Sequence, residues 1–418
     1  MAGEWTRLPL EDCMEAIIDY RGKTPKKASS GIPLITAKVV KGGRIETPDE
    51  FIAVDDYDAW MRRGLPKAGD IVMTTEAPLG EVAQLGTERV ALAQRIIALR
   101  GKKGLLDNDF LKFLMQSEDV QKQLRARATG TTVLGIKQTE LRKVFLTLPA
   151  LPEQRAIAHI LGTLDDKIEV NRRMSHTLEA MARALFKSWF VDFDPVRAKM
   201  QGRWRRGQSL PGLPDHLYDL FPARLVESEL GEIPEGWSVK RLGDLLELAY
   251  GKALKAEDRR DGEVPVYGSN GQVGWHDEPL ARGPGIVVGR KGNPGIVTWA
   301  PTDFYVIDTA FYVVPKGTCH SVRFLFHALR AHDLASLGAD SAVPGLNRNL
   351  AYMSPQLLPP AALLEKFEEV VRVLDVRVHK CNQESRTLAG LRDALLPKLI
   401  SGEIRVKDAE RFLKQRGL

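Results

Sequence analysis

The chain has few cysteines and no long apolar run, and each lack excludes a class of protein. Its three cysteines, Cys13, Cys319 and Cys381, lie far apart among 418 residues, so neither a disulfide framework nor a CxxC metal or redox motif is available. No apolar run approaches the roughly 18 residues that a bilayer span needs. We therefore expect a cytoplasmic protein without a dedicated metal site.

Motifs of catalysis are equally scarce. No GxxxxGK[ST] is present, and the glycines around Gly283 and Gly289 miss the GxGxxG spacing, so a nucleotide site is not predicted. Residues 192–195 are superficially like the catalytic loop of amino-methyltransferases, but the loop's second proline is missing and no glycine-rich cofactor turn lies upstream. These absences predict a binding protein without chemistry of its own.

The composition favours a folded chain and is compatible with a polyanionic partner. Hydrophobic residues make up 44% of the sequence and charged residues 27%, close to the averages of globular proteins. The length is enough for two or three domains of roughly 100 to 200 residues each. Sixty Lys and Arg against 54 Asp and Glu give a net charge of +6. This excess is compatible with nucleic acid as a partner but does not establish one.

The sequence repeats itself. A shift of 210 superposes residues 133–137 on 343–347 and residues 148–149 on 358–359. Upstream the offset grows to 215, where Ile71 meets Ile286, and then to 232, where Ile32 meets Val264. A long period indicates a duplicated architecture. We therefore predict two diverged globular modules, each followed by the same kind of segment.

Both of the following segments are predicted to be long helices. Their apolar residues recur every 3.5 positions, which is typical of coiled coils, whereas one copy alone would fit an ordinary bundle helix equally well. The first seam runs through Ile157, Leu161, Leu164, Ile168, Asn171, Ser175, Leu178, Ala182, Leu185 and Trp189, and the second through Phe367, Val371, Leu374, Val378, Cys381, Ser385, Leu388, Arg392, Leu395 and Leu399. Polar residues occupy matching steps, and an antiparallel pairing would bring them together. Such rods, roughly 60 Å long, suit a spacer.

The predicted fold class is α+β, with two mixed, strand-rich globular domains, each followed by a long helix, and the two helices pairing as an antiparallel coiled coil. Strands are expected at 31–35, 70–73 and 81–85, and again at 264–267, 285–288 and 295–299; later helices are expected at 109–127 and 321–337. The predicted boundaries are a first domain at 1–150, a helix at 151–195, a linker at 196–230, a second domain at 231–360, a second helix at 361–402 and a C-terminal tail at 403–418.

Three stretches of the sequence carry a resemblance to a known family. They read Leu-Pro-Ala-Leu-Pro-Glu-Gln-Arg-Ala-Ile at 148–157 with Leu-Asp-Asp-Lys-Ile at 164–168, Ser-Trp-Phe-Val-Asp-Phe-Asp-Pro-Val at 188–196, and Leu-Leu-Pro-Lys-Leu-Ile-Ser-Gly-Glu-Ile at 395–404. The chain resembles, over nearly its whole length, the specificity subunit of type I restriction–modification systems. Residues 361–365 depart from the Pro-Glu-Gln opening that the family has in its distal repeat.

The resemblance implies a function for each part. The two globular modules would be target-recognition domains that read the unlike halves of a bipartite DNA site. The paired helices would hold them at a set separation and dock two methyltransferase (modification) subunits, which would carry S-adenosylmethionine and methylate adenine. Motor and nuclease (restriction) subunits would be further partners. The chain itself would be a non-catalytic specificity subunit with no cofactor or metal of its own.

Candidate DNA contacts are polar or basic residues in turn-rich loops, because such side chains donate to phosphates and base edges. In the first domain they are Lys23, Thr24, Lys26, Lys27, Thr131, Thr132 and Lys137, and in the second Lys252, Ser269, Asn270, Gln272, Arg290, Lys291 and Asn293. For any one of them, simple solvent exposure or turn formation is at least as good an explanation.

Two other classes of function stay open at this stage. A self-sufficient methyltransferase or nuclease would retain S-adenosylmethionine or show activity as a single chain. A protein-only scaffold would select no sequence from random DNA duplexes. The missing catalytic motifs speak against the first, and the family resemblance favours DNA specificity over the second.

Overall fold

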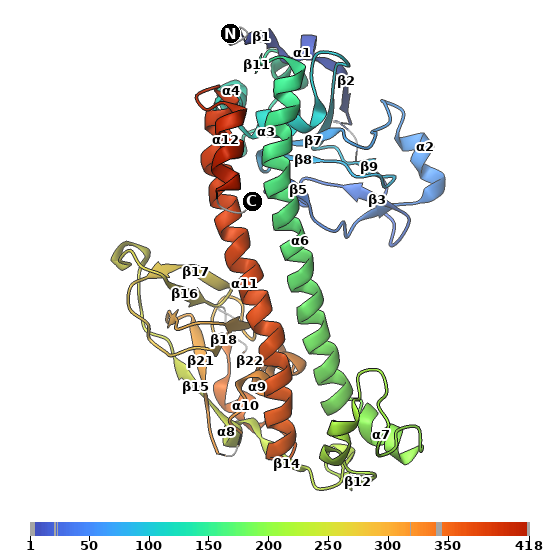
Figure 1. Ribbon diagram of the computed structural model, residues 1–418, viewed down its shortest axis with the longest axis vertical. Coiled ribbons are helices and arrows are strands. Elements are labelled where there is room, and N and C mark those ends of the chain that lie inside the picture. The colour runs from blue at the N-terminus through green and yellow to red at the C-terminus, as the bar shows by residue number, and fades with distance from the viewer. Residues whose placement is uncertain (1–4, 21, 23, 318, 340–344, 416–418) are drawn as a thin grey trace. The chain divides into compact units, whose positions relative to one another are not determined.

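The structure, a computed structural model, describes residues 5–415 except 21, 23, 318 and 340–344. It divides into two compact units, Met1–Val170 with Glu384–Leu418, and Asn171–Gln383. Each unit holds one strand-rich domain, blue or yellow to orange in Figure 1, and half of each of two 40-residue helices, α6 (Leu151–Phe190) and α11 (Ala361–Ile400). The predicted α+β fold with two long helices is confirmed.

A four-stranded antiparallel sheet forms the centre of the first domain. Its order is β2 (Met14–Asp19), β10 (Ile96–Gly101), β7 (Ile71–Thr75) and β8 (Leu79–Gln84). Alternate residues of β7 point into two different hydrophobic cores. Ile71 lies in the core that also contains residues of α6, and Val72 lies in the core on the other face of the sheet. Both faces of the sheet are therefore covered, which explains why its strands read as short apolar runs without polar alternation.

Short strands and helices complete this unit. The strands are β1 (Thr6–Pro9) paired with β11 (Phe145–Leu148), β3 (Ile32–Ile35) with β6 (Phe51–Ile52) and β9 (Ala91–Leu92), and β4 (Val40–Lys41) with β5 (Arg44–Ile45). The helices are α1 (Leu10–Cys13), α2 (Tyr57–Trp60), α3 (Asn108–Gln116), α4 (Glu118–Arg127), α5 (Gln138–Leu141) and α12 (Val406–Lys414).

The second domain repeats this plan. Its four-stranded sheet has the order β15 (Leu246–Tyr250), β21 (Ala310–Pro315), β18 (Gly285–Gly289) and β19 (Val297–Ala300). Again alternate residues face different cores, Ile286 toward the long helices and Val287 away from them. The order matches that of the first domain strand for strand. Equivalent strands differ in residue number by 232, 214 or 215, close to the offsets found in the sequence comparison.

The remaining elements of the second unit follow the same correspondence. Its strands are β14 (Ser238–Arg241) with β24 (Pro355–Leu358), β16 (Val264–Gly268) with β17 (Gly271–His276) and β20 (Tyr305–Val306), β22 (Gly338–Ala339) with β23 (Gly345–Leu346), and β12 (Leu225–Ser228) with β13 (Gly231–Pro234). Its helices are α7 (Asp194–Met200), α8 (Leu242–Leu245), α9 (Val322–Ala331) and α10 (Arg348–Met353). The β12–β13 hairpin belongs to the connection between the repeats, and α7 follows α6 as α12 follows α11.

In both units α6 and α11 run antiparallel. In the first, Asp165 of α6 binds Arg392 of α11 at 2.8 Å, and Lys167 binds Glu384 at 2.9 Å. As the residue number rises along α6, the residue that it contacts on α11 has a lower number, which is the antiparallel direction. All fourteen apolar seam residues proposed for the helix pair are buried or half-buried: Ile157, Leu161, Leu164, Ile168, Leu178, Leu185, Trp189, Phe367, Val371, Leu374, Val378, Leu388, Leu395 and Leu399.

Polar residues also lie within the helix pair. Within the second unit, Asn171 and Ser175 are buried, and the Ser175 hydroxyl donates to the Asn382 side-chain oxygen at 3.4 Å. Farther along, Phe186 and Phe190 of α6 pack on Phe367 of α11, with ring centroids 6.1 and 5.0 Å apart. The pairing direction expected from the sequence is therefore present in each unit.

Three local expectations differ from the structure. The helix expected at 321–337 ends at Ala331, and Leu334–Leu337 forms a separate 3-10 turn. The helix expected at 109–127 is split into α3 and α4, because Ser117 takes an extended conformation and its hydroxyl caps α4 by accepting from the Val120 amide. The segment expected as a tail forms α12, which follows the left-handed turn at Gly402 and buries Ala409 and Leu413 in the core of the first unit. Because Ala409 and Leu413 are apolar and four residues apart, the sequence could have predicted α12.

Buried ion pairs tie each domain to its part of α6 or α11. In the first unit Lys112 of α3 binds Asp165 of α6 at 2.5 Å. In the second, Arg323 of α9 binds Asp375 of α11 at 2.6 Å. Asp165 and Asp375 are related by the repeat offset of 210, so the duplicated chain uses the same anchor twice.

Candidate nucleic-acid interface

The first group of predicted contacts lies around a surface hollow of about 260 Å³ in the first domain. The Thr24 hydroxyl donates to the Gln94 side-chain oxygen at 3.0 Å, and Lys27 forms an ion pair with Glu50 at 2.8 Å. Both line the hollow together with Arg95, and Lys26 is exposed beside them. Lys23 lies outside the described residues.

The second group occupies a tight loop in the same domain. Thr129 and Gly135 exchange two backbone hydrogen bonds, of 2.8 and 2.9 Å, which leave Thr131 and Thr132 exposed at the tip. Gly130 has a φ of +116°, and a side chain there would lie 2.1 Å from the Val133 carbonyl oxygen, so the turn requires glycine. Lys137 is exposed just before α5.

Glu76 and Arg95, which the sequence analysis missed, link these two groups. The Ile136 amide donates to the Thr75 carbonyl at 3.0 Å, and Gly135 forms a β-bridge with Glu76. Glu76 in turn binds Arg95 at 2.7 Å, and Arg95 borders the hollow. We call residues 24–27, 75–76, 94–95 and 129–137 the first loop cluster.

The second domain builds the same framework from different side chains. The Arg290 amide donates to the Thr309 carbonyl at 2.9 Å, as Thr75 donates to Arg95, and the Leu346 amide donates to the Arg290 carbonyl at 2.9 Å, as Ile136 does to Thr75. Lys291 bridges Gly345, as Glu76 bridges Gly135. Arg290 and Lys291 therefore stand where the first domain has Thr75 and Glu76. Applying the offset of 215 to these two candidates would have found their counterparts from sequence.

The other candidates of the second domain adjoin this turn. Gly289 packs so closely that an added side chain would lie 2.3 Å from the Asn293 carbonyl oxygen and 2.9 Å from that of Ser269. The Lys252 amide donates to the Val306 carbonyl at 2.9 Å, three residues before Thr309. We call residues 250–252, 269–272, 290–293, 308–309 and 345–348 the second loop cluster.

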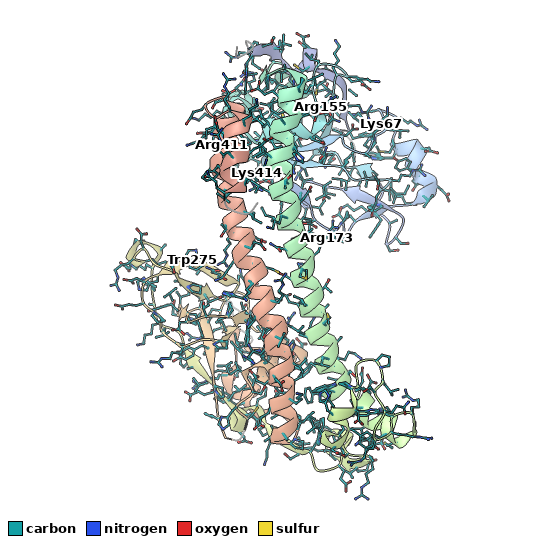
Figure 2. All side chains as sticks on the ribbon, in the orientation of Figure 1. Lys67, Arg155, Arg173, Trp275, Arg411 and Lys414 are labelled. Carbon is teal, nitrogen blue, oxygen red and sulfur yellow. The ribbon has the colours of Figure 1, made fainter. Side chains whose placement is uncertain are left out.

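The β16–β17 hairpin extends this cluster. Asn270 and Gln272 are exposed at the turn, where the Gln272 amide nitrogen donates to the Gly274 carbonyl at 3.2 Å. Trp275 lies farther along β17 with 42% of its surface exposed, and Figure 2 shows it on this hairpin. An exposed indole suits stacking or apolar contact with a ligand, and the sequence analysis did not select it.

The equivalent turns of the two loop clusters differ in charge. In the first, Glu76 neutralises Arg95, whereas in the second Arg290, Lys291 and Arg348 place three cations around the equivalent turn. Side chains with only donors favour acceptors such as phosphate oxygens and guanine, while a carboxylate accepts from cytosine. The pair of surfaces is therefore able to bind two different sequences.

The described residues hold no metal-binding group, and two of the buried thiols are not activated. Burial raises the pKa of the Cys13 and Cys319 thiols to about 11, which keeps both protonated near neutral pH. Among residues with a described placement, no group of three His, Cys, Asp or Glu side chains could hold a metal ion. No helix in the described part of the chain is long and apolar enough to cross a membrane.

Comparison with known proteins agrees with this arrangement. The family model "Type I restriction modification DNA specificity domain" matches residues 3–180 and 234–348, one span for each repeat. The type I restriction enzyme MjaIX specificity subunit of Methanocaldococcus jannaschii is 25% identical over 83% of this chain and 80% of its own length. The HindI specificity subunit of Haemophilus influenzae is also 25% identical, over 76% of this chain and 82% of its own.

A solved structure shares the fold. The S subunit of a type I restriction–modification system from M. genitalium aligns with a TM-score of 0.59 at 18% identity, covering 95% of this chain and 96% of that one. The likeness extends through both strand-rich domains and both long helices. With a family model that spans most of the sequence, the chain belongs to the DNA specificity subunits of type I restriction–modification systems.

Proposed function

We propose that the first and second loop clusters each read one half of an asymmetric, bipartite DNA site. The chain is a non-catalytic specificity subunit whose partners are DNA and a methyltransferase complex. The observation that carries the proposal is the shared backbone framework of the two clusters with unlike side chains on it. Thr75 and Glu76 in one domain stand at the places of Arg290 and Lys291 in the other. One framework with two sets of donors and acceptors predicts two half-sites of unlike sequence.

The long helices are the proposed docking surface for two methyltransferase subunits. Several large apolar side chains project from them into solvent instead of into the seam. Met174 and Met181 of α6 are 38% and 52% exposed and lie two turns apart, hence on one side of the helix. Val373 and Val376 of α11, 64% and 46% exposed, form a similar pair. Exposed apolar pairs of this kind favour a protein partner.

S-adenosylmethionine belongs, in this proposal, to the methyltransferase partner and not to this chain. Restriction subunits would join through the same partner. A cytoplasmic location stays a prediction. None of these points alters the role of the two loop clusters, which is to select the DNA that the assembled complex modifies.

The test is to express the chain with its methyltransferase subunit and to map methylated adenines across the host genome. We expect one motif with two specified halves of different sequence, separated by unspecified bases. Methylation by the purified chain alone would support a self-sufficient enzyme. A complex that assembles but selects no sequence from random duplexes would support a protein-only scaffold, and either result contradicts the proposal.

Docking is tested separately with Met181→Glu. Placing a charge in an apolar interface should abolish co-purification of the methyltransferase subunit. Met200→Glu is the matched control, since Met200 is equally exposed, at 51%, but lies on α7 outside the helix pair. If Met181→Glu binds the partner as well as the control does, the docking face lies elsewhere.

A further inference from the structure

An exposed tyrosine between two arginines stands at the centre of the second loop cluster. Tyr250 ends strand β15 and keeps 50% of its surface exposed. The guanidinium carbon of Arg290 lies 4.8 Å from the centre of its ring, and that of Arg348 lies 4.9 Å from it. We call these three residues the Arg–Tyr–Arg cluster. Cation–π contacts at such distances hold a guanidinium group over a ring.

Backbone carbonyls fix both arginines further. Arg290 donates from Nη1 to the Asp308 carbonyl at 3.1 Å, and Arg348 donates from Nη1 to the Leu248 carbonyl at 3.4 Å. Both side chains are only half-buried. A guanidinium has five N–H donors, so one such bond leaves donors for a ligand. A side chain held on two sides loses less entropy on binding than a freely rotating one.

The chemistry of the cluster selects its ligand. The cluster combines an aromatic surface with two planar groups that only donate hydrogen bonds. A guanidinium binds best to two acceptors that lie side by side in its plane. Guanine presents such a pair, O6 and N7, in the major groove. A phosphate also accepts from arginine, but phosphate contacts need no fixed orientation, and the exposed Lys291 beside the cluster can supply them.

The first domain lacks this cluster at the equivalent positions. The strand registers pair Phe311 with Tyr250 and Ile97 with Asp19, which places Asp19 where the second domain has Tyr250. Thr75 stands at the place of Arg290, and Gln138, which opens α5, stands at that of Arg348, which opens α10. Guanine reading of this kind therefore belongs to one domain only.

We propose that the Arg–Tyr–Arg cluster reads guanine in the half-site bound by the second domain. This inference rests on the proposed function, because it names the base class that one of the two loop clusters recognises. Arg290 and Arg348 supply the donors, and the Tyr250 ring holds them in place. Neither Tyr250 nor Arg348 is apparent as a contact from sequence, since they lie 98 residues apart and meet only through the fold.

The experiment measures methylation of a randomised duplex library by the assembled complex. Arg348→Lys keeps the charge but loses the planar fork, so we expect preference for one guanine to fall by about 5- to 150-fold while other positions are unaffected. Arg290→Lys and Tyr250→Leu should act on the same half-site. Tyr250→Phe, which keeps the ring, is the matched control and should retain the preference. Lys291→Ala should weaken all sequences alike.

The outcomes separate the inference from the function beneath it. If the unaltered complex methylates no bipartite site, the proposed function is wrong, and the inference that rests on it is overturned with it. If it methylates a bipartite site but Arg348→Lys preserves every base preference, the cluster contacts phosphate and the inference is overturned. A half-site without guanine would overturn it as well. Equal co-purification of the methyltransferase by all variants excludes misfolding as the cause of a change.

Discussion

The two units of the chain anchor their domains with equivalent residues but in different electrostatic settings. Asp165 receives two cations, Lys112 at 2.5 Å and Arg392 at 2.8 Å, and its side chain is 16% exposed. Asp375 shares Arg323 with Glu368, and burial raises its pKa to about 6 against the opposing effect of Arg323. The comparison teaches that duplication retained the position of the anchor while its charge balance diverged.

The loop clusters show the same rule at the surface. Backbone hydrogen bonds of nearly identical length hold Thr75 and Arg290 in place, yet one turn continues with a carboxylate and the other with an ammonium group. Backbone bonds do not depend on side-chain identity, so loops can change their binding chemistry without changing their path. If the proposed function holds, the framework and the specificity are carried by separate atoms.

The largest expected effect breaks the helix pair in one unit. Leu164 is 2% exposed in the core of the first unit, and its counterpart Leu374 is half-buried in the second. Leu164→Asp leaves a cavity and buries a charge, at a cost of about 5 kcal/mol of unfolding free energy, whereas Leu374→Asp should cost about half of that. Chemical denaturation of both variants, with methyltransferase co-purification alongside, checks this. Equal losses would show that the two seams are equally packed.

A smaller difference is expected at the anchors themselves. Asp165→Asn removes the carboxylate from two cations and should destabilise the chain by about 3 kcal/mol, because breaking a buried pair leaves uncompensated charge. Asp375→Asn should change stability by less than about 1 kcal/mol, since Glu368 still neutralises Arg323 and burial already disfavours the Asp375 carboxylate at pH 7. Denaturant titration at pH 7 measures both. If Asp375→Asn proves the more damaging change, the assignment of charge balance is reversed.

The raised pKa of Asp375 gives the second unit its own pH dependence. Between about pH 4 and 6 the folded state holds a proton on Asp375 that the unfolded state has lost, so this group lowers stability as the pH rises through that window. His327 acts in the opposite direction, because burial lowers its pKa to about 4 and the unfolded state binds the proton below about pH 6.5. In the intact protein the two effects largely cancel.

Two variants separate these opposing contributions. Asp375→Asn should leave the His327 effect alone, so stability should rise by about 2 kcal/mol between pH 4 and 6.5. His327→Phe should leave the Asp375 effect and give a decline over the same range. Unfolding curves recorded across the window test both signs. Parallel profiles for the two variants would contradict the assignment of either group.

The smallest effects come from exchanging the surface charges of the loop clusters. Lys291→Glu should lower the affinity of the assembled complex for all sequences and reduce the salt dependence of binding by about one counterion. Glu76→Lys should raise affinity modestly and release Arg95. Binding isotherms at several salt concentrations supply the slopes. Unchanged slopes for both variants would place these two residues outside the DNA interface.

Local patterns predicted much of this fold, while contacts between distant residues stayed hidden. A period of 3.5 was sufficient to predict both long helices, although α6 ends at Phe190, five residues before the expected boundary at 195. The pairing of Glu76 with Arg95 joins two turns that only the sheet brings together, so no spacing rule could reveal it. Ser117 followed by Glu118 and Asp119 is a helix-start pattern, and the prediction of one continuous helix overlooked it.

A domain transplant tests the proposal that one framework, used twice, reads two different half-sites. Replacing residues 10–144, which lie between β1 and β11, with residues 242–354, which lie between β14 and β24, gives a chain with two copies of the second domain. Mapping its methylated adenines should yield a site whose halves share one sequence, the half-site that the second domain reads in the natural chain. If the site keeps its original unlike halves, specificity does not reside in these domains.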